Sequence, residues 1–156
     1  MRAIFESRWF RFFVLLYALH QVGHLLLNAQ YYFWPVAPFP APPADGAWSD
    51  EMINFFDAMG VIDSLSGLAG LVFVVGYLRR RTWAPWLGLV ATSAYLPSIG
   101  MFSYGCWASG TWHDNVLLQS TAVVSFIPTL VIFGWLSTAF NREARRSEAG
   151  FGGGGS

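Results

Sequence analysis

Four long apolar runs fill most of this 156-residue chain, at residues 9–33, 54–78, 83–104 and 115–140. Each run is longer than the roughly 20 residues that a helix needs to cross a bilayer. Hydrophobic residues make up 54% of the chain and charged residues only 12%, a composition typical of an integral membrane protein. We therefore predict an all-α, integral membrane four-helix bundle in residues 1–148. The glycine-rich residues 149–156 are typical of a flexible linker or an appended tail.

The basic residues predict which way the bundle faces. All nine are arginines, and they lie only near the start of the first run, between the second and third runs, and after the fourth. Alternate crossings bring these three places to the same side of the membrane, and the positive-inside rule assigns that side to the cytoplasm. Both termini are then cytoplasmic, in the inner membrane of a bacterium or in the endoplasmic reticulum of a eukaryote. The arginines form no clustered basic face on a soluble surface, so we expect no nucleic-acid partner.

Small residues and prolines inside the runs predict how the helices pack. Ser66 and Gly70 fall on one helix face, and such spacing of small residues lets a second helix approach closely. Pro97 and Pro128 lie inside the third and fourth runs, where proline bends a helix and frees a backbone carbonyl. These bends indicate room between the helices. Five prolines in residues 35–49 favour an extended loop between the first two runs.

Polar residues inside the first two runs are the strongest functional signal, because placing ionisable groups in hydrocarbon costs free energy. His20, His24 and Asn28 are spaced four residues apart, which puts them on one helix face. Asp57 and Asp63 lie six residues apart, so both cannot point straight at that face. Counting the helical rise matches His24 and Asn28 with Asp57 in depth, and His20 with Asp63. Asp57 is therefore the preferred acid of a predicted pocket. The third and fourth runs add polar residues at similar depth, among them Tyr95, Ser98 and Thr121.

Four short motifs point to a known family. The sequence from His24 to Asn28, followed by aromatic residues, looks like a His-x-x-x-Glu motif in a first core helix. Asp50, followed seven residues later by Asp57, looks like an Asp-x6-Glu entry to a second helix. Residues 78–80 match a basic turn, and Pro128 matches a proline of the last helix. In these patterns the chain resembles the EXPERA superfamily, which contains the emopamil-binding sterol isomerases and the sigma-2 receptor. The resemblance implies a four-helix core that binds a sterol-like or cationic amphiphilic ligand.

The resemblance also implies roles for individual residues. Sterol isomerisation needs one group to donate a proton to an alkene and another to remove one, while acids stabilise the intervening cation. His24 and Asp57 are the implied catalytic pair. Asn28 stands where the isomerases carry an acid, and it cannot transfer that proton; Thr121 and Val124 stand where they carry Asn and Trp. The candidate ligand-binding residues are His20, Asn28, Asp63, Tyr95, Ser98 and Thr121.

Three functions stay open at the level of the sequence. The first is an EXPERA-like protein that binds a lipid or sterol-like small molecule within the membrane. It would act either as an isomerase or as a binder without catalysis. For this function we expect no metal and no cofactor. The second is a metal or haem site made by His20, His24, Asp57 and His113, since histidines four residues apart with a carboxylate suit zinc or iron. The third is a subunit of a homodimer or larger membrane complex, docked through the small-residue face of run 54–78.

Overall fold

The protein is all-helical in the part of the chain that its computed structural model describes, which is residues 2–33, 49–108, 110, 112–113 and 116–152. This part contains α1 (Arg2–Glu6), α2 (Arg8–Phe33), α3 (Asp50–Leu78), α4 (Ala84–Ala108) and α5 (Val116–Gly152). The four long helices cover the four apolar runs, so the all-α prediction is confirmed. The short α1 was not expected. The predicted loop at 35–49 lies outside the described residues, apart from Ser49.

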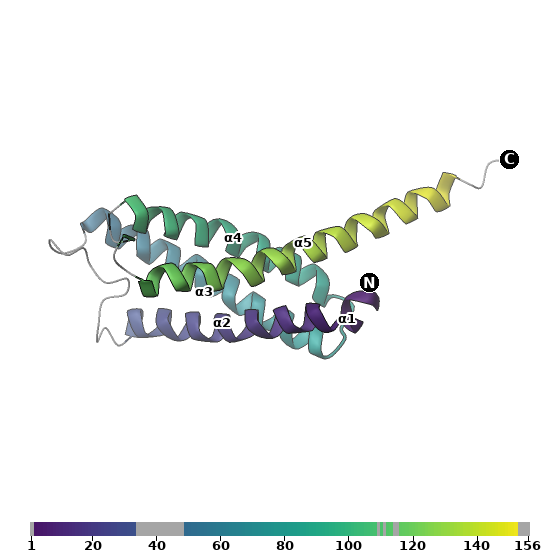
Figure 1. The fold of residues 1–156 in the computed structure, drawn as a ribbon, viewed down its shortest axis with the longest axis horizontal. Helices are drawn as coiled ribbons and strands as arrows, with labels where there is room; N and C mark the ends of the chain where they lie inside the picture. Colours follow the sequence, from purple (N-terminus) through teal and green to yellow (C-terminus); the bar gives the residue numbers. More distant parts are fainter. Residues whose placement is uncertain (1, 34–48, 109, 111, 114–115, 153–156) are drawn as a thin grey trace.

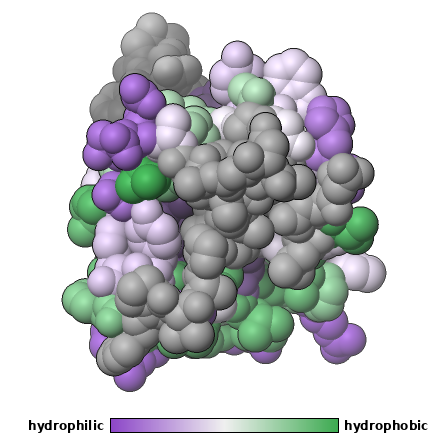
Figure 2. All heavy atoms as spheres, turned by 90° about the vertical axis from the view of Figure 1, so that its left-hand side faces the viewer, coloured by the Kyte–Doolittle hydropathy of each residue, from purple (hydrophilic) through white to green (hydrophobic). Residues whose placement is uncertain are grey.

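The four long helices pack side by side and alternate in direction (Figure 1). As a result, α1 and the last turns of α5 lie at the same end of the bundle. All nine arginines belong to this end, because they lie in α1, at the start of α2, in the α3–α4 turn and in the last part of α5. We call it the arginine end. Figure 2 looks onto the opposite end, where hydrophilic and hydrophobic residues are mixed.

Serine caps set the starts of the first two long helices. Ser7 Oγ accepts a hydrogen bond from the Phe10 N–H at 3.2 Å, which separates α1 from α2. Ser49 Oγ accepts in the same way from the Met52 N–H at 3.3 Å, and two acidic residues in the first turn of α3 favour the positive end of its dipole. Both helices therefore begin before the apolar runs from which they were predicted.

Three helices of the described part are long and apolar enough to cross a membrane, namely α2, α3 and the Gln119–Arg146 part of α5. With 25 residues, including Pro97 in its interior, α4 is long enough to cross, but it is not among the three. The last helix runs on through Pro128, and its second half leaves the bundle (Figure 1). The helix α5 continues past residue 149 to Gly152. That residues 149–156 are a flexible linker or an appended tail stays a prediction.

Glycines on α3 let α2 approach closely, as the spacing of small residues predicted. Gly67 and Gly70 are buried, and so is Ser66. A Cβ atom at Gly67 would lie 3.0 Å from Gln21 Oε1, and one at Gly70 would overlap the Tyr17 hydroxyl. We call the contact of Tyr17 and Gln21 with Gly67 and Gly70 the glycine seam. Because α2 fills the seam, this face of α3 is not free to dock a partner subunit.

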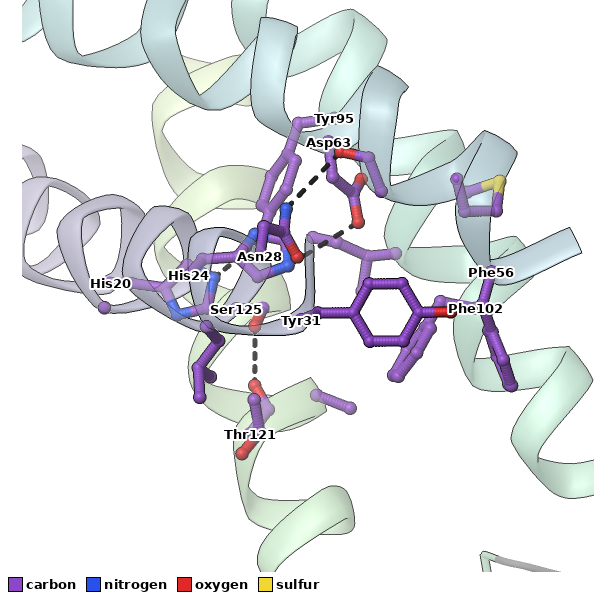
Figure 3. A pocket seen from close by; sticks show the side chains of 16 residues that line it. His20, His24, Asn28, Tyr31, Phe56, Asp63, Tyr95, Phe102, Thr121 and Ser125 are labelled. Carbon is purple, nitrogen blue, oxygen red and sulfur yellow. Dashed lines mark hydrogen bonds and ion pairs between the residues drawn. The ribbon is translucent and has the colours of Figure 1, made fainter. Parts of the chain in front are cut away.

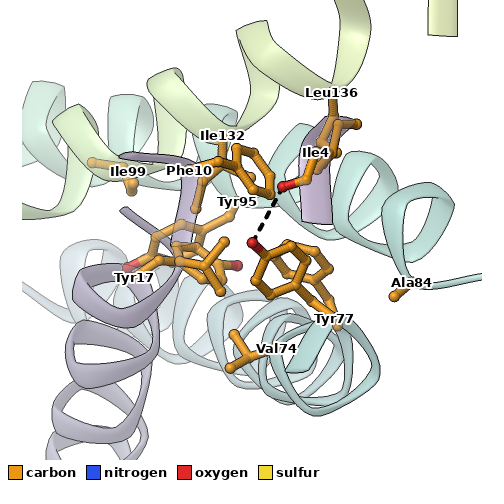
Figure 4. Close-up of a cluster of buried hydrophobic side chains, with 12 residues drawn as sticks. Ile4, Phe10, Tyr17, Val74, Tyr77, Ala84, Tyr95, Ile99, Ile132 and Leu136 are labelled. Carbon is orange, nitrogen blue, oxygen red and sulfur yellow. Dashed lines mark hydrogen bonds between the residues drawn. The ribbon is translucent and has the colours of Figure 1, made fainter. Parts of the chain in front are cut away.

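Aromatic and aliphatic side chains fill the arginine end of the bundle (Figure 4). Phe10 meets Tyr77 edge to face, with ring centroids 5.3 Å apart, and meets Trp135 of α5 at 5.2 Å. The Tyr77 hydroxyl donates a hydrogen bond to the Ile4 carbonyl at 3.3 Å, which ties α1 to α3. This core holds the helices together at one end and leaves the opposite half of the bundle to carry a site.

The packing of α4 on this core can be tested with one methyl group. A Cβ atom at Gly88 would lie 2.7 Å from the Phe73 ring and 2.9 Å from Leu136 Cδ1, so Gly88→Ala forces core side chains apart. We expect the free energy of unfolding in detergent, followed by circular dichroism, to fall by about 1–3 kcal/mol. Gly100→Ala on the same helix is the control, because a Cβ atom there meets nothing within 4 Å. Equal stability of the two variants would contradict the described packing.

Candidate functional site

A cavity of about 200 Å³ lies between α2, α3, α4 and α5, on the side of the core away from the arginine end (Figure 3). Its apolar walls include Phe56, Met59, Ile99 and Phe102. Polar side chains enter from all four helices: His20, His24, Asn28, Tyr31, Asp63, Tyr95, Thr121 and Ser125. Apolar walls with a few convergent polar groups are typical of small-molecule sites.

Four of these polar groups form one connected chain. The Tyr95 hydroxyl lies 2.6 Å from Nε2 of His20 and 3.0 Å from Nδ1 of His24. Nε2 of His24 lies 3.5 Å from Oδ2 of Asp63, and Ser98 Oγ donates a hydrogen bond to Oδ1 of Asp63. Asp63 and Tyr95 are only 7% and 1% exposed, so bulk water has little access to either residue. We call His20, Tyr95, His24 and Asp63 the His–Tyr–His–Asp chain.

This chain has a direction, because a tyrosine carries a single hydroxyl proton. When His24 accepts from Tyr95 at Nδ1, the Tyr95 oxygen accepts from His20 Nε2–H. A proton that enters at Nδ1 of His20 can therefore pass through the Tyr95 hydroxyl to His24 without moving a side chain. His24 Nε2 and Asp63 Oδ2 lie 3.5 Å apart, at ion-pair distance, so transfer onward to Asp63 requires these two groups to approach more closely.

Asn28 and Tyr31 lie on α2 farther from the arginine end than the His–Tyr–His–Asp chain. Asn28 Nδ2 donates to Ser64 Oγ at 3.2 Å and to the Gly60 carbonyl at 3.5 Å. The Tyr31 hydroxyl donates to Oδ1 of Asp57 at 2.9 Å. Asp57 itself is half-buried and does not line the cavity. Its role in this geometry is to hold the Tyr31 phenol from outside the pocket.

The predicted depth match between α2 and α3 was wrong. We expected His24 to face Asp57 and His20 to face Asp63, but His24 faces Asp63, and Asp57 bonds to Tyr31. The reason is steric, because the side chains of Tyr17 and Gln21 fit where α3 has glycine, and this seam sets the register. The ends of the apolar runs define depth only to within about a turn. Asp63 is therefore the carboxylate of the pocket, in place of Asp57.

The other predicted site residues divide into two groups. His20, Asn28, Tyr95 and Thr121 line the cavity together with Asp63, and their role in ligand binding stays a prediction. Ser98 touches the cavity only indirectly, since it contacts Asp63 and does not line the space itself.

Sequence reasoning missed Tyr31 and the aromatic walls. Tyr31 lies seven residues after His24 and so on the same face of α2, and this spacing could have identified it. The rings of Phe56 and Phe102 lie with centroids 5.8 Å apart across α3 and α4. No spacing in the sequence separates these two phenylalanines from the other aromatic residues of the runs.

The multi-ligand metal centre that the sequence left open as an alternative is not assembled in the described residues. In residues 2–33, 49–108, 110, 112–113 and 116–152, no three His, Cys, Asp or Glu side chains come together to hold a metal ion. His20 and His24 stack with ring centroids 5.6 Å apart, and both bond to Tyr95. Asp57 points to another part of α2, and His113 is exposed in the turn before α5. The four expected ligands thus do not share one centre.

Comparison with known proteins finds no match among protein-family models, curated proteins or solved structures. The resemblance to the EXPERA superfamily therefore rests on its short motifs and stays a prediction.

Tyr95→Phe tests whether the His–Tyr–His–Asp chain acts as one unit. In the wild type, the imidazole ¹⁵N shifts of His20 and His24 should change together in a pH series in nanodiscs, because the Tyr95 hydroxyl couples them. Phenylalanine keeps the ring but removes the hydroxyl, so the two histidines should then respond separately. Tyr31→Phe is the control, since its hydroxyl bonds outside the chain. Separate responses already in the wild type would contradict the coupling.

Proposed function

We propose that the protein is an integral membrane protein with four spans and a cytoplasmic arginine end. Three helices have the length and composition for crossing. α3 ends at the arginine end and α5 starts at the opposite one, so α4, which joins them, has to cross as well. The position of all nine arginines at one end supports the orientation. The membrane is then the bacterial inner membrane, or the endoplasmic reticulum in a eukaryote, and the cavity lies between mid-depth and the far leaflet.

We propose further that the cavity binds the polar head of a lipid-like or sterol-like amphiphile, with a cationic or hydroxyl-bearing group at Asp63. The observation that carries this proposal is the placement of Asp63, the one carboxylate among the described lining residues, in a buried and mostly apolar space. A carboxylate at this depth requires a charged or hydrogen-bonding partner. Ser98 donates a hydrogen bond to Oδ1 of Asp63, but His24 approaches Oδ2 only to 3.5 Å, so a ligand can supply a closer partner at Oδ2.

The volume of the cavity indicates how much of the ligand enters. Small-molecule sites usually measure roughly 300–1,000 Å³, and this cavity measures about 200 Å³. It can therefore take a head group and the adjoining atoms, but it does not enclose a whole sterol. Gly23 lines the cavity and is exposed, so the cavity opens beside Gly23 on α2. The apolar body of the ligand would leave there, toward the lipid.

Binding is the function that this geometry supports best, ahead of sterol isomerisation. The His–Tyr–His–Asp chain can store and pass a proton, as an isomerase needs. A ring system that stays outside the cavity, however, would not present its double bond to these groups. Turnover of a sterol by the purified protein would restore the isomerase prediction.

Asp63→Asn should weaken the binding of a cationic amphiphile by about 30-fold or more. Removing one partner of a buried charge pair costs about 2–5 kcal/mol, and the asparagine keeps the size of the side chain. The measurement is displacement of a fluorescent cationic amphiphile from protein in nanodiscs. Asp57→Asn is the matched control on the same helix. It should change the affinity much less, because Asp57 does not line the cavity and an asparagine Oδ1 can still accept the hydrogen bond from Tyr31. An unchanged affinity in Asp63→Asn, or an equal loss in both variants, would contradict the proposal.

Gly23→Leu should close the opening of the cavity. A Cβ atom at Gly23 meets nothing within 4 Å, so the variant should fold and yet place an isobutyl group at the mouth. We expect loss of amphiphile binding with little change in the free energy of unfolding. Gly100→Leu is the control, because Gly100 is equally open but lies outside the cavity lining. If Gly23→Leu binds like the wild type, ligands do not enter beside α2.

A further inference from the structure

A second hollow lies at the arginine end and is lined by residues of α1 and α5 and by Ser7 between α1 and α2. It lies on the part of α5 that leaves the bundle, whose course is seen in Figure 1. Its volume is about 600 Å³, three times that of the first cavity. Ile4 and Ser7 form one side, and the other side is a long stripe of α5 that runs from Leu130 to Arg146. We call this hollow the α1–α5 groove.

The lining of the groove changes from apolar to basic along α5. Leu130, Val131 and Trp135 line its deeper part, and Arg142 and Arg146 line its outer part. Arg142 is also the first charged residue of α5, so it marks the level at which the helix leaves the hydrocarbon. Along the groove, apolar residues are followed by basic residues. This order matches a lipid molecule, in which apolar acyl chains are followed by a charged head group.

The length of the stripe fits one leaflet of a bilayer. At about 1.5 Å of rise per residue, the distance from Leu130 to Arg146 is about 24 Å. One leaflet with its head groups is about 20–22 Å thick. A lipid that lies along the stripe would therefore reach from the arginines to near the middle of the membrane.

The charge at the outer end selects the head group. Arg142 and Arg146 are exposed, and Glu143 also lines this end, so two guanidinium groups face one carboxylate and leave a net positive charge. Basic pockets between helices on the cytoplasmic side bind anionic head groups. Arginine is well suited to this role, because its planar fork of donors matches the oxygens of a phosphate.

We propose that the α1–α5 groove binds one anionic phospholipid of the cytoplasmic leaflet, with its phosphate at Arg142 and Arg146 and an acyl chain along Leu130 and Trp135. This site is separate from the cavity at Asp63. It depends on the proposed orientation of the bundle and not on the identity of any ligand in that cavity. The lipid would fill the space that opens where α5 diverges from α1.

A glycine on the floor of the groove offers a second way to test the proposal. Gly134 lines the groove and is exposed, and a Cβ atom there would meet nothing within 4 Å. Gly134→Leu therefore fills the apolar part of the groove and leaves both arginines in place. This variant tests the acyl chain, and the arginine variants test the phosphate.

The experiment is native mass spectrometry of the full chain released from nanodiscs of phosphatidylglycerol and phosphatidylcholine. We expect the wild type to retain one phosphatidylglycerol. The double variant Arg142→Gln, Arg146→Gln should weaken this binding by about 25-fold, since each arginine near an anionic surface contributes about fivefold. Arg145→Gln is the matched control, because Arg145 is equally exposed on the same turn but does not line the groove. It should lose much less affinity than the double variant, because its guanidinium does not reach a phosphate bound in the groove.

Three results would overturn the proposal. An equal loss in Arg145→Gln would show a diffuse attraction to the membrane surface and no site. If the double variant keeps the lipid, or if Gly134→Leu keeps it as well as the control Gly100→Leu does, the lipid binds elsewhere. Displacement of the lipid by inorganic phosphate would show a plain anion site that does not use the apolar part of the groove.

Discussion

The close contact of α2 with the glycines of α3 sets the positions of the other parts of the structure. A Cβ atom at Gly70 would overlap the Tyr17 hydroxyl and one at Gly67 would crowd Gln21, so glycine at both positions allows the register in which the two helices meet. From that register it follows that His24 lies against Asp63, and that Asn28 lies against Ser64. A shift of α3 by one turn would break both contacts and would bring larger side chains under α2. The functional site is thus a consequence of backbone packing some distance away along the same two helices.

One half of the bundle, at the arginine end, is a packed core, and the other half contains the polar cavity. At the arginine end, Phe10, Tyr77 and Trp135 interlock, and Trp135 also lines the α1–α5 groove. In the other half, polar side chains from all four long helices enter between apolar walls, and a cavity remains where they meet. Tyr95 belongs to both halves, since its ring packs on Tyr17 and its hydroxyl joins the two histidines. A rigid half can therefore hold the polar groups of the other half at fixed distances.

Much of this architecture could be predicted from the sequence, because long apolar runs and polar residues at helical spacing are local signals. The runs indicated four long helices, and the spacing of His20, His24 and Asn28 placed all three on the face that lines the cavity. The choice between Asp57 and Asp63 could not be made in this way. That choice depends on how two helices slide along each other, which is decided by the shapes of facing side chains. For the same reason Phe56 could not be recognised as a wall of the cavity.

The glycine seam also carries a free-energy cost. The Tyr17 hydroxyl and both polar atoms of the Gln21 amide are buried without a hydrogen-bond partner in the described part of the chain. A buried polar group left unpaired costs about 1–3 kcal/mol. Movement of α2 away from α3 would let these groups bond to water or to a ligand, and it would recover part of that cost while giving up van der Waals contact. A ligand that gives Gln21 a hydrogen-bond partner would remove part of this cost, and it would therefore favour a wider separation of α2 and α3.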